Sequence, residues 1–261
     1  MTQIKSEESF ETLRNWLEMP LGGALLQQES RMVEEVFDGI FGEQCLQLGL
    51  WGEANVFLRF ARTQQSACIA DIGNIGKKRG AVTRPSAVGH LYRLPIASDS
   101  VDVVLLPHTL DYVVRSHAIL REVYRVLRSD GQLVVLGFKP GGLWGLMRLI
   151  PGARLPPGVD RFISERRLSD WLQLLNFKIH GSTRYFFRWP LTSNRSSISL
   201  LWEQRGQRWW PELGACYMLT AQKRIYTLTT MKKPWRSRPK VVVGLAKHTT
   251  RMSRIRFDRN S

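Results

Sequence analysis

The chain has little cysteine, and the spacing of the three residues excludes the common metal-binding and disulfide patterns. Cys45, Cys68 and Cys216 stand far apart in 261 residues, each within an apolar run. No C-x-x-C pair or Cys/His ligand spacing is present, so the sequence indicates no zinc site and we expect no bound metal. Three buried, reduced thiols are the expectation, and they favour a cytoplasmic protein.

Long apolar runs are also absent. No stretch of about 18 apolar residues is uninterrupted, so we expect no transmembrane helix. The first residues, MTQIKSEESFE, are charged and lack the apolar core of a secretory signal. Because 43% of the residues are hydrophobic, the chain can still bury a sizeable core, and its length suits one large α/β domain.

Acidic residues are scarce at the C-terminal end, and this scarcity explains most of the net charge of +16. Residues 223–261 hold 12 of the 38 Lys and Arg residues but one of the 22 acids, Asp258. We therefore predict a domain over residues 1–231 and a basic, disordered tail over 232–261. Such a tail is typical of a nucleic-acid or anionic membrane contact, and equally of a solubilising end.

Apolar segments of strand length alternate with amphipathic helical segments. We expect helices over residues 27–41, 55–62, 116–127 and, capped by Ser164, up to 176. We expect strands over residues 45–51, 66–72, 101–106 and 132–138, with late, antiparallel strands inside 178–189 and 213–229. This order predicts an α/β fold built on a doubly wound, mostly parallel sheet.

A series of short motifs runs through the middle of the chain. They are Leu94-Pro95-Ile96, Ser98-Asp99-Ser100, Val101-Asp102-Val103-Val104, His108-Thr109-Leu110 and the stretch from Leu120 to Gly131. Together they resemble the type 11 domain of class I S-adenosylmethionine-dependent methyltransferases, over about Gln44 to Phe138. Later segments, among them DWLQLLNF and LGACYMLTAQKR, resemble an uncharacterised group of methyltransferase-like proteobacterial proteins. The resemblance implies a Rossmann-like methyltransferase fold and S-adenosyl-L-methionine as cofactor.

The cofactor residues follow from this resemblance and from the geometry of a doubly wound sheet, which binds ligands at the carboxyl ends of its strands. A glycine must end the first strand to admit the cofactor, and an acid about 20 residues later binds the ribose. The residues expected at the cofactor are Gly49, Leu50, Gly52, Asp71, His90, Leu91 and His108. The alternatives are a plain turn at Gly49, a solvated acid at Asp71 and a hydrogen-bonded His108 at a strand end; the catalytic residues stay unidentified.

The first glycine motif departs from the family pattern. Aligned on Gly49, Gln47 replaces the family's acid, Trp51 its second glycine and Glu53 its third. The family's acid beside the adenine is here His90, whose neutral imidazole can still accept a hydrogen bond. For cofactor to bind, Trp51 must turn out of the pocket, and we expect this open rotamer. We read Asp111 as a helix cap or, with Tyr112, as part of the pocket rim.

Three functions remain open from the sequence. The first is a methyltransferase acting on a small-molecule or lipid-like acceptor, whose catalysis needs little beyond alignment of acceptor and methyl group. The second is a degenerate methyltransferase fold that serves as a binding or regulatory protein, suggested by Trp51 and Glu53. The third is an RNA-directed methyltransferase that uses the basic tail.

Overall fold

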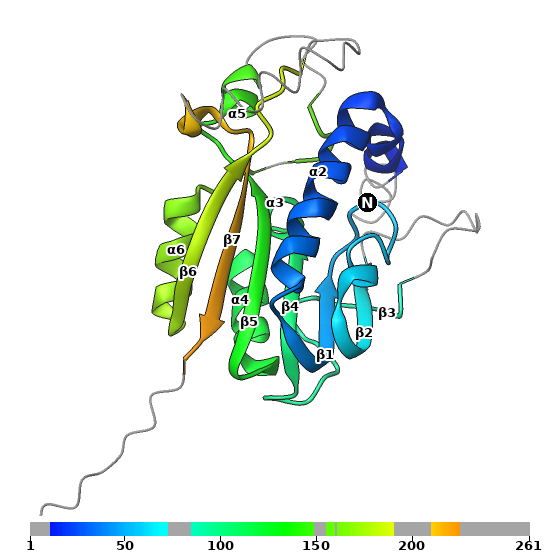
Figure 1. Cartoon of the computed structure of the whole chain (residues 1–261), viewed down its shortest axis with the longest axis vertical. Helices are drawn as coiled ribbons and strands as arrows, with labels where there is room; N and C mark the ends of the chain where they lie inside the picture. Colours follow the sequence, from blue (N-terminus) through cyan, green and yellow to red (C-terminus); the bar gives the residue numbers. More distant parts are fainter. Residues whose placement is uncertain (1–10, 73–84, 149–154, 160, 191–209, 225–261) are drawn as a thin grey trace, which may run out of the picture. The chain divides into compact units, whose positions relative to one another are not determined.

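The computed structural model describes residues 11–72, 85–148, 155–159, 161–190 and 210–224. Within them, strands form one mixed sheet in the order β3-β2-β1-β4-β5-β7-β6 (Figure 1). The strands are β1 (Phe41–Leu48), β2 (Arg62–Asp71), β3 (Ala87–Gly89), β4 (Val101–Pro107), β5 (Leu127–Phe138), β6 (Phe177–Tyr185) and β7 (Cys216–Lys223). The first five are parallel, and β7 runs antiparallel to β5 and β6. The predicted architecture is confirmed.

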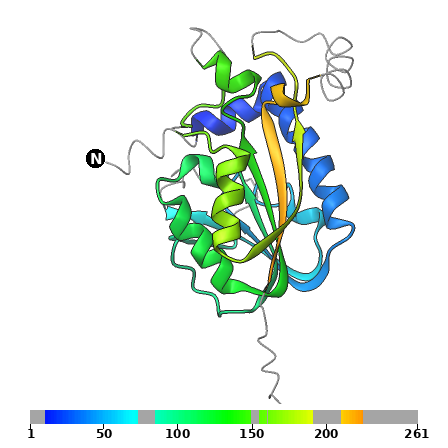
Figure 2. The same cartoon turned by 90° about the vertical axis from the view of Figure 1, so that its left-hand side faces the viewer.

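Helices cover both faces of this sheet. The long helix α2 (Pro20–Phe37) lies over one face, and α4 (Ser116–Val126) and α6 (Glu165–Leu174) lie over the other, as the views in Figures 1 and 2 show. Two short helices, α3 (Thr109–Tyr112) and α5 (Leu143–Met147), follow the carboxyl ends of β4 and β5. Residues 11–18, before α2, are also helical.

Alternation along the central strands explains why both faces are covered. Leu105 belongs to the apolar cluster that contains Val33 of α2. The next residue, Leu106, belongs to the opposite cluster with Val123 of α4. Successive strand side chains point to opposite faces, so the continuous apolar run of β4 requires a helix layer on each side.

The topology brings the ends of β1 and β4 together. From β1 the chain goes outward to β2 and β3, and it then returns to place β4 on the other side of β1. Ligands of doubly wound sheets bind at this reversal, beyond the carboxyl ends of the strands. Gly49 follows β1 and His108 follows β4, so both expected site residues lie at the reversal.

Most predicted elements are confirmed, and one is wrong. The α6 helix begins where expected, because the Ser164 hydroxyl accepts a hydrogen bond from the Arg167 backbone N–H at 3.3 Å. The helix expected over residues 55–62 is only a 3₁₀ turn, η1 (Leu58–Phe60). It is this short because β2 begins at Arg62, where that residue pairs with Phe41 of β1.

Two further expectations concern membrane-spanning helices and the C-terminal tail. Among the described residues, no helix combines the length and the apolarity that crossing a bilayer requires. The predicted tail, residues 232–261, and the last part of the predicted domain, residues 225–231, lie outside the described residues. The boundary at residue 231 and the role of the tail stay predictions.

Candidate functional site

The turn after β1 has the geometry that the glycine motif predicts. Gly49 has φ +89°, a region that favours glycine, and its N–H donates to the Ile69 carbonyl at 2.8 Å. A Cβ at this position would lie 2.5 Å from the Thr109 hydroxyl oxygen, so a side chain has no room. Gln47 is fully buried, and its amide donates to the Gly49 carbonyl at 3.0 Å, which ties the strand end to the turn.

Leu50 and Gly52 continue the same turn. Leu50 is half-buried, and Gly52 has φ +77°. Gly52 lines a cavity of about 550 Å³ between the turn and the N-terminal helices, whose polar lining includes Arg14, Arg31 and Glu34. The turn therefore borders open space on the α2 side, and its glycines are required by backbone conformation.

Asp71, His90 and Leu91 come together at the ends of β2 and β3. The Leu91 and Ile72 backbone N–H groups donate to the Asp71 carboxylate, and the His90 imidazole lies close enough to interact with it. Desolvation by partial burial outweighs these contacts and raises the pKa of Asp71. Leu91 is buried, while His90 is exposed and stacks on Tyr92 with ring centroids 5.0 Å apart.

His108 lies apart from these residues, beneath the turn and fully buried. Its backbone is left-handed, with φ 52°, and its Nε2 lies 2.7 Å from Oε1 of Glu29 on α2. On the other side, Oδ2 of Asp111 lies 3.5 Å from its Nδ1. Burial acts to lower the pKa of His108, but Glu29 and Asp111 together outweigh it and raise this pKa to about 9. Both acidic side chains therefore favour the protonated form of the His108 ring.

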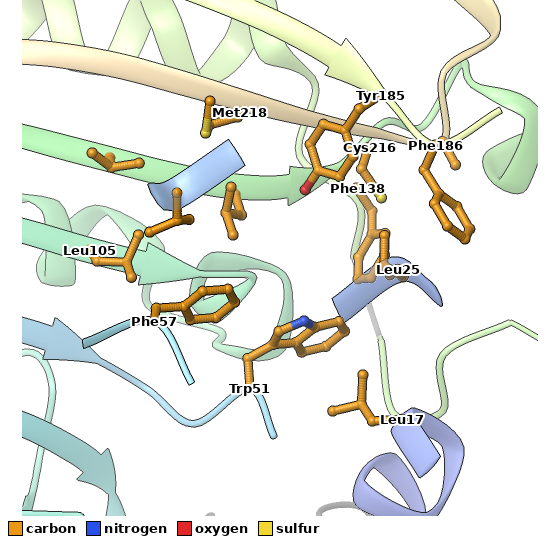
Figure 3. Close-up of a cluster of buried hydrophobic side chains, with 14 of the residues drawn as sticks. Leu17, Leu25, Trp51, Phe57, Leu105, Phe138, Tyr185, Phe186, Cys216 and Met218 are labelled. Carbon is orange, nitrogen blue, oxygen red and sulfur yellow. The ribbon is translucent and has the colours of Figure 1, made fainter. Parts of the chain in front are cut away.

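The expected open rotamer of Trp51 is wrong. The indole is fully buried, and its Nε1–H donates to Oε2 of Glu29 at 2.6 Å. The ring centroid lies 4.3 Å from that of His108 and 5.8 Å from that of Phe138. Figure 3 shows the indole directed into the apolar cluster between α2 and the sheet, near Leu25 and Phe57. A buried carboxylate acceptor and aromatic neighbours stabilise this inward rotamer.

Asp111 differs from one of its two expected roles, and the expected place of Tyr112 at the pocket rim stays a prediction. Asp111 does not cap a helix; it is buried, and it accepts hydrogen bonds from the Phe138 N–H at 3.0 Å and the Ile163 N–H at 3.3 Å. Burial raises its pKa. Tyr112 is half-buried, with its ring 6.2 Å from that of Trp51. Both residues belong to the surroundings of His108 and Trp51.

Glu29 joins these groups and was missed in the sequence. Its carboxylate accepts from Trp51 and, at 3.0 Å, from the Tyr185 hydroxyl, and it contacts His108. A signal was present, because Glu29 is spaced four residues from both Leu25 and Val33 on the apolar side of α2. A charged residue at such a position is seldom buried without partners, so this spacing indicates a buried polar cluster around Glu29.

Comparisons with known proteins agree with this architecture. Residues 60–135 match a family model described as a methyltransferase domain, and this match begins downstream of the Gly49–Gly52 turn. The uncharacterised protein YafS of Escherichia coli is 32% identical over 217 residues, which is 82% of each chain. Demethylmenaquinone methyltransferase of Mycolicibacterium paratuberculosis is 38% identical over 73 residues, which is 27% of this chain and 32% of that protein.

A solved structure extends the agreement to the fold. A SAM-dependent methyltransferase from Archaeoglobus fulgidus superposes with a TM-score of 0.52 at 15% identity, covering 77% of this chain and 94% of the other. At this identity the superposition reports on the fold alone, and it places the strand order described above among methyltransferase folds.

Proposed function

Because this chain carries a class I, type 11 methyltransferase domain and belongs to one family with the uncharacterised protein YafS, we propose that it methylates a small-molecule or lipid-like acceptor. The observation that carries the proposal lies at the ends of β1 and β2, which we name the adenosine edge. Gly49 ends β1 where no Cβ fits, and Asp71 ends β2 beside Leu91. These are the two features that a nucleoside at the carboxyl ends of a doubly wound sheet requires.

The residues at this edge suit the adenosine half of the cofactor. Asp71 has a half-buried carboxylate, which would accept hydrogen bonds from the two ribose hydroxyls. Leu91 provides a buried apolar side chain for one face of the adenine, and His90 a ring nitrogen that can accept from its amino group. When bound, S-adenosylmethionine supplies an electrophilic methyl group on a sulfonium, and the protein's task is to align the acceptor with it.

The methionine half requires a local rearrangement. Trp51 follows the β1 turn, at the position of the family's second glycine, and its indole fills the space between the turn, His108 and α2. We propose that cofactor binding moves this indole away from Glu29. Displacement would expose Glu29 and the Tyr185 hydroxyl, two polar groups that can orient an acceptor, and the Glu29 carboxylate can take its proton.

A second candidate function rests on the same tryptophan. The buried indole is held by a hydrogen bond to the Glu29 carboxylate and by aromatic contacts, so it can block the site permanently. The family match also begins after this turn. If the Trp51 indole never leaves the site, the chain is a catalytically inactive relative that binds another ligand or protein. We rank this below the enzyme because the methyltransferase domain matches over residues 60–135 and an acid, Asp71, still ends β2.

Methyl transfer tests the proposal directly. The full chain is incubated with S-adenosylmethionine labelled in the methyl group and with fractionated aqueous and lipid extracts, and products are found by label and by a mass gain of one methylene. The variant Asp71→Ala is the negative comparison, and Asp170→Asn, an exposed acid on α6, is the matched control. Transfer lost only with Asp71→Ala supports the enzyme. Absence of both cofactor binding and methyl transfer supports the inactive relative.

Two further features remain proposals. Cys45, Cys68 and Cys216 are buried and form no disulfide, which supports a reducing, cytoplasmic location. The basic tail is a candidate contact for nucleic acid or an anionic membrane surface. Binding to RNA or to anionic vesicles that weakens with salt and is lost without residues 232–261 would support that role.

A further inference from the structure

We propose that the buried cluster of Glu29, His108 and Cys216 is a binding site for a divalent transition metal of the zinc type. One ligand atom from each side chain, a carboxylate oxygen, an imidazole nitrogen and the sulfur, lies within 4.8 Å of the other two. All three residues are fully buried. Carboxylate, imidazole and thiolate are the ligand types that Zn²⁺ takes, and three protein ligands with one open position are typical of its reactive sites.

The three ligands come from different elements, which is why their sequence spacing shows no metal motif. Glu29 lies on α2, His108 follows β4, and Cys216 begins β7. The register of the sheet brings Cys216 into place, since it pairs with Tyr185 of β6 (Figure 3). The Tyr185 hydroxyl contacts the same Glu29 oxygen as His108 and adds a fourth polar group to the cluster.

Outer side chains lie behind the nitrogen and the oxygen ligand, as they do in metal sites. Asp111, fixed by two backbone N–H groups, directs Oδ2 at the far nitrogen of His108. Trp51 donates to Oε2 of Glu29 and leaves Oε1 on the ligand side. The inward position of Trp51, which the cofactor alone does not explain, is accounted for by this orientation of Glu29.

His108 is poorly accommodated by its protein partners alone. Among the described residues, its Nδ1 has no hydrogen-bond partner, and the 3.5 Å to Asp111 is beyond a well-formed bond. Its backbone is also in the left-handed region, which costs energy for a residue other than glycine. A metal on Nε2 would leave the ring neutral, with its one proton on Nδ1, directed at Asp111.

The His108 and Glu29 ligand atoms lie closer together than they would in a loaded site. Ligand atoms on a tetrahedral zinc ion lie about 3.4 Å apart, given metal–ligand distances of about 2.0–2.2 Å to nitrogen and oxygen. His108 and Glu29 are 2.7 Å apart. The ion would therefore separate them by about 0.7 Å, a shift available to the flexible Glu29 side chain, and Cys216 would bind as the thiolate.

The test uses the full chain and needs neither cofactor nor acceptor, so its outcome is independent of methyl transfer. Purified protein is loaded with Zn²⁺, dialysed and analysed for metal by mass spectrometry, and metal-stripped protein is titrated with Co²⁺. We expect one retained zinc per chain, a higher melting temperature with zinc, and a thiolate-to-cobalt charge-transfer band. Cys216→Ser should abolish that band, whereas Cys45→Ser, at another buried cysteine, should keep it.

A second variant covers the case in which Cys216→Ser does not fold. Asp111→Asn keeps an acceptor for His108 but weakens its orientation, and loss of such an outer partner lowers metal affinity by about 10- to 100-fold. The inference is overturned if wild-type protein retains no zinc after loading, if bound cobalt lacks the thiolate band, or if Cys45→Ser removes that band as fully as Cys216→Ser does.

Discussion

Trp51→Phe separates a tryptophan that opens for the cofactor from one that is a permanent part of the core. Phenylalanine keeps an aromatic ring against His108 and Phe138 but cannot donate to Glu29. A hydrogen bond to a charged acceptor contributes about 1.5–3 kcal/mol. The variant should therefore lose about that much free energy of unfolding, and its melting temperature should fall by about 3–12 °C for a domain of this size.

Loss of the hydrogen bond between Trp51 and Glu29 should also strengthen cofactor binding by a similar free energy. If the indole must leave Glu29 before the cofactor binds, the cost of opening is subtracted from the binding free energy, and removing the bond returns it. S-Adenosylhomocysteine should then bind Trp51→Phe more tightly than wild type, by up to about 10- to 150-fold, the equivalent of 1.5–3 kcal/mol. Calorimetric titration and denaturant unfolding of the same samples measure both quantities.

Trp144→Phe is the matched control for this experiment. Trp144 is also fully buried, and its Nε1–H donates at 2.9 Å to the Arg188 carbonyl instead of to Glu29. The control should lower stability and leave cofactor affinity unchanged. A Trp51→Phe variant that loses stability but binds with wild-type affinity would refute displacement of the indole. A variant that binds more weakly would show that the indole contacts the cofactor.

Three further predictions concern the stability of the fold. Gly49→Ala should lower the free energy of unfolding by about 2 kcal/mol or more, because φ is +89° and a Cβ would lie 2.5 Å from the Thr109 hydroxyl oxygen. An unchanged midpoint in denaturant unfolding would contradict that geometry. Burial opposes ionisation of Asp102, but the Gln44 and Glu43 N–H groups and Arg128 lower its pKa overall, so its carboxylate stabilises the fold above the unfolded-state pKa of about 3.9. The stability difference between wild type and Asp102→Asn should therefore shrink as the pH falls below about 4, and a constant difference would refute it. Deletion of residues 232–261 should leave the melting temperature within about 5 °C of wild type, and a larger fall would show that this segment docks on the domain.

The sequence predicted the fold wherever local pattern decides the structure. The apolar run of β4 and the amphipathic face of α4 required a parallel sheet with helices on both sides, and Ser164 marked the start of α6. The turn at Gly49 followed from the same logic, because its conformation is a property of a few adjacent residues. The helix expected over residues 55–62 does not form, because its last residue, Arg62, pairs instead with Phe41 of β1.

The interior of the site was not predictable in this way. Trp51 turns inward because of Glu29, which is 22 residues away, and Glu29 is held by His108 and Tyr185, which are 79 and 156 residues away. No periodicity links positions so far apart, and tertiary packing alone brings them together. The one local sign was a glutamate on the apolar face of α2. The helix cap, one of two roles expected for Asp111, is wrong for the same reason, since its partners Phe138 and Ile163 are distant in sequence.

Titration of S-adenosylhomocysteine into the full-length wild-type chain, followed by calorimetry, tests the central claim most directly. The adenosine edge at Gly49 and Asp71 predicts binding of one ligand per chain. Asp71→Ala should weaken that binding by about 10- to 150-fold, through loss of bonds to a charged group, while Asp170→Asn leaves it unchanged. Absence of binding to the wild type at millimolar ligand, or equal affinity of wild type and Asp71→Ala, would contradict the proposed cofactor site.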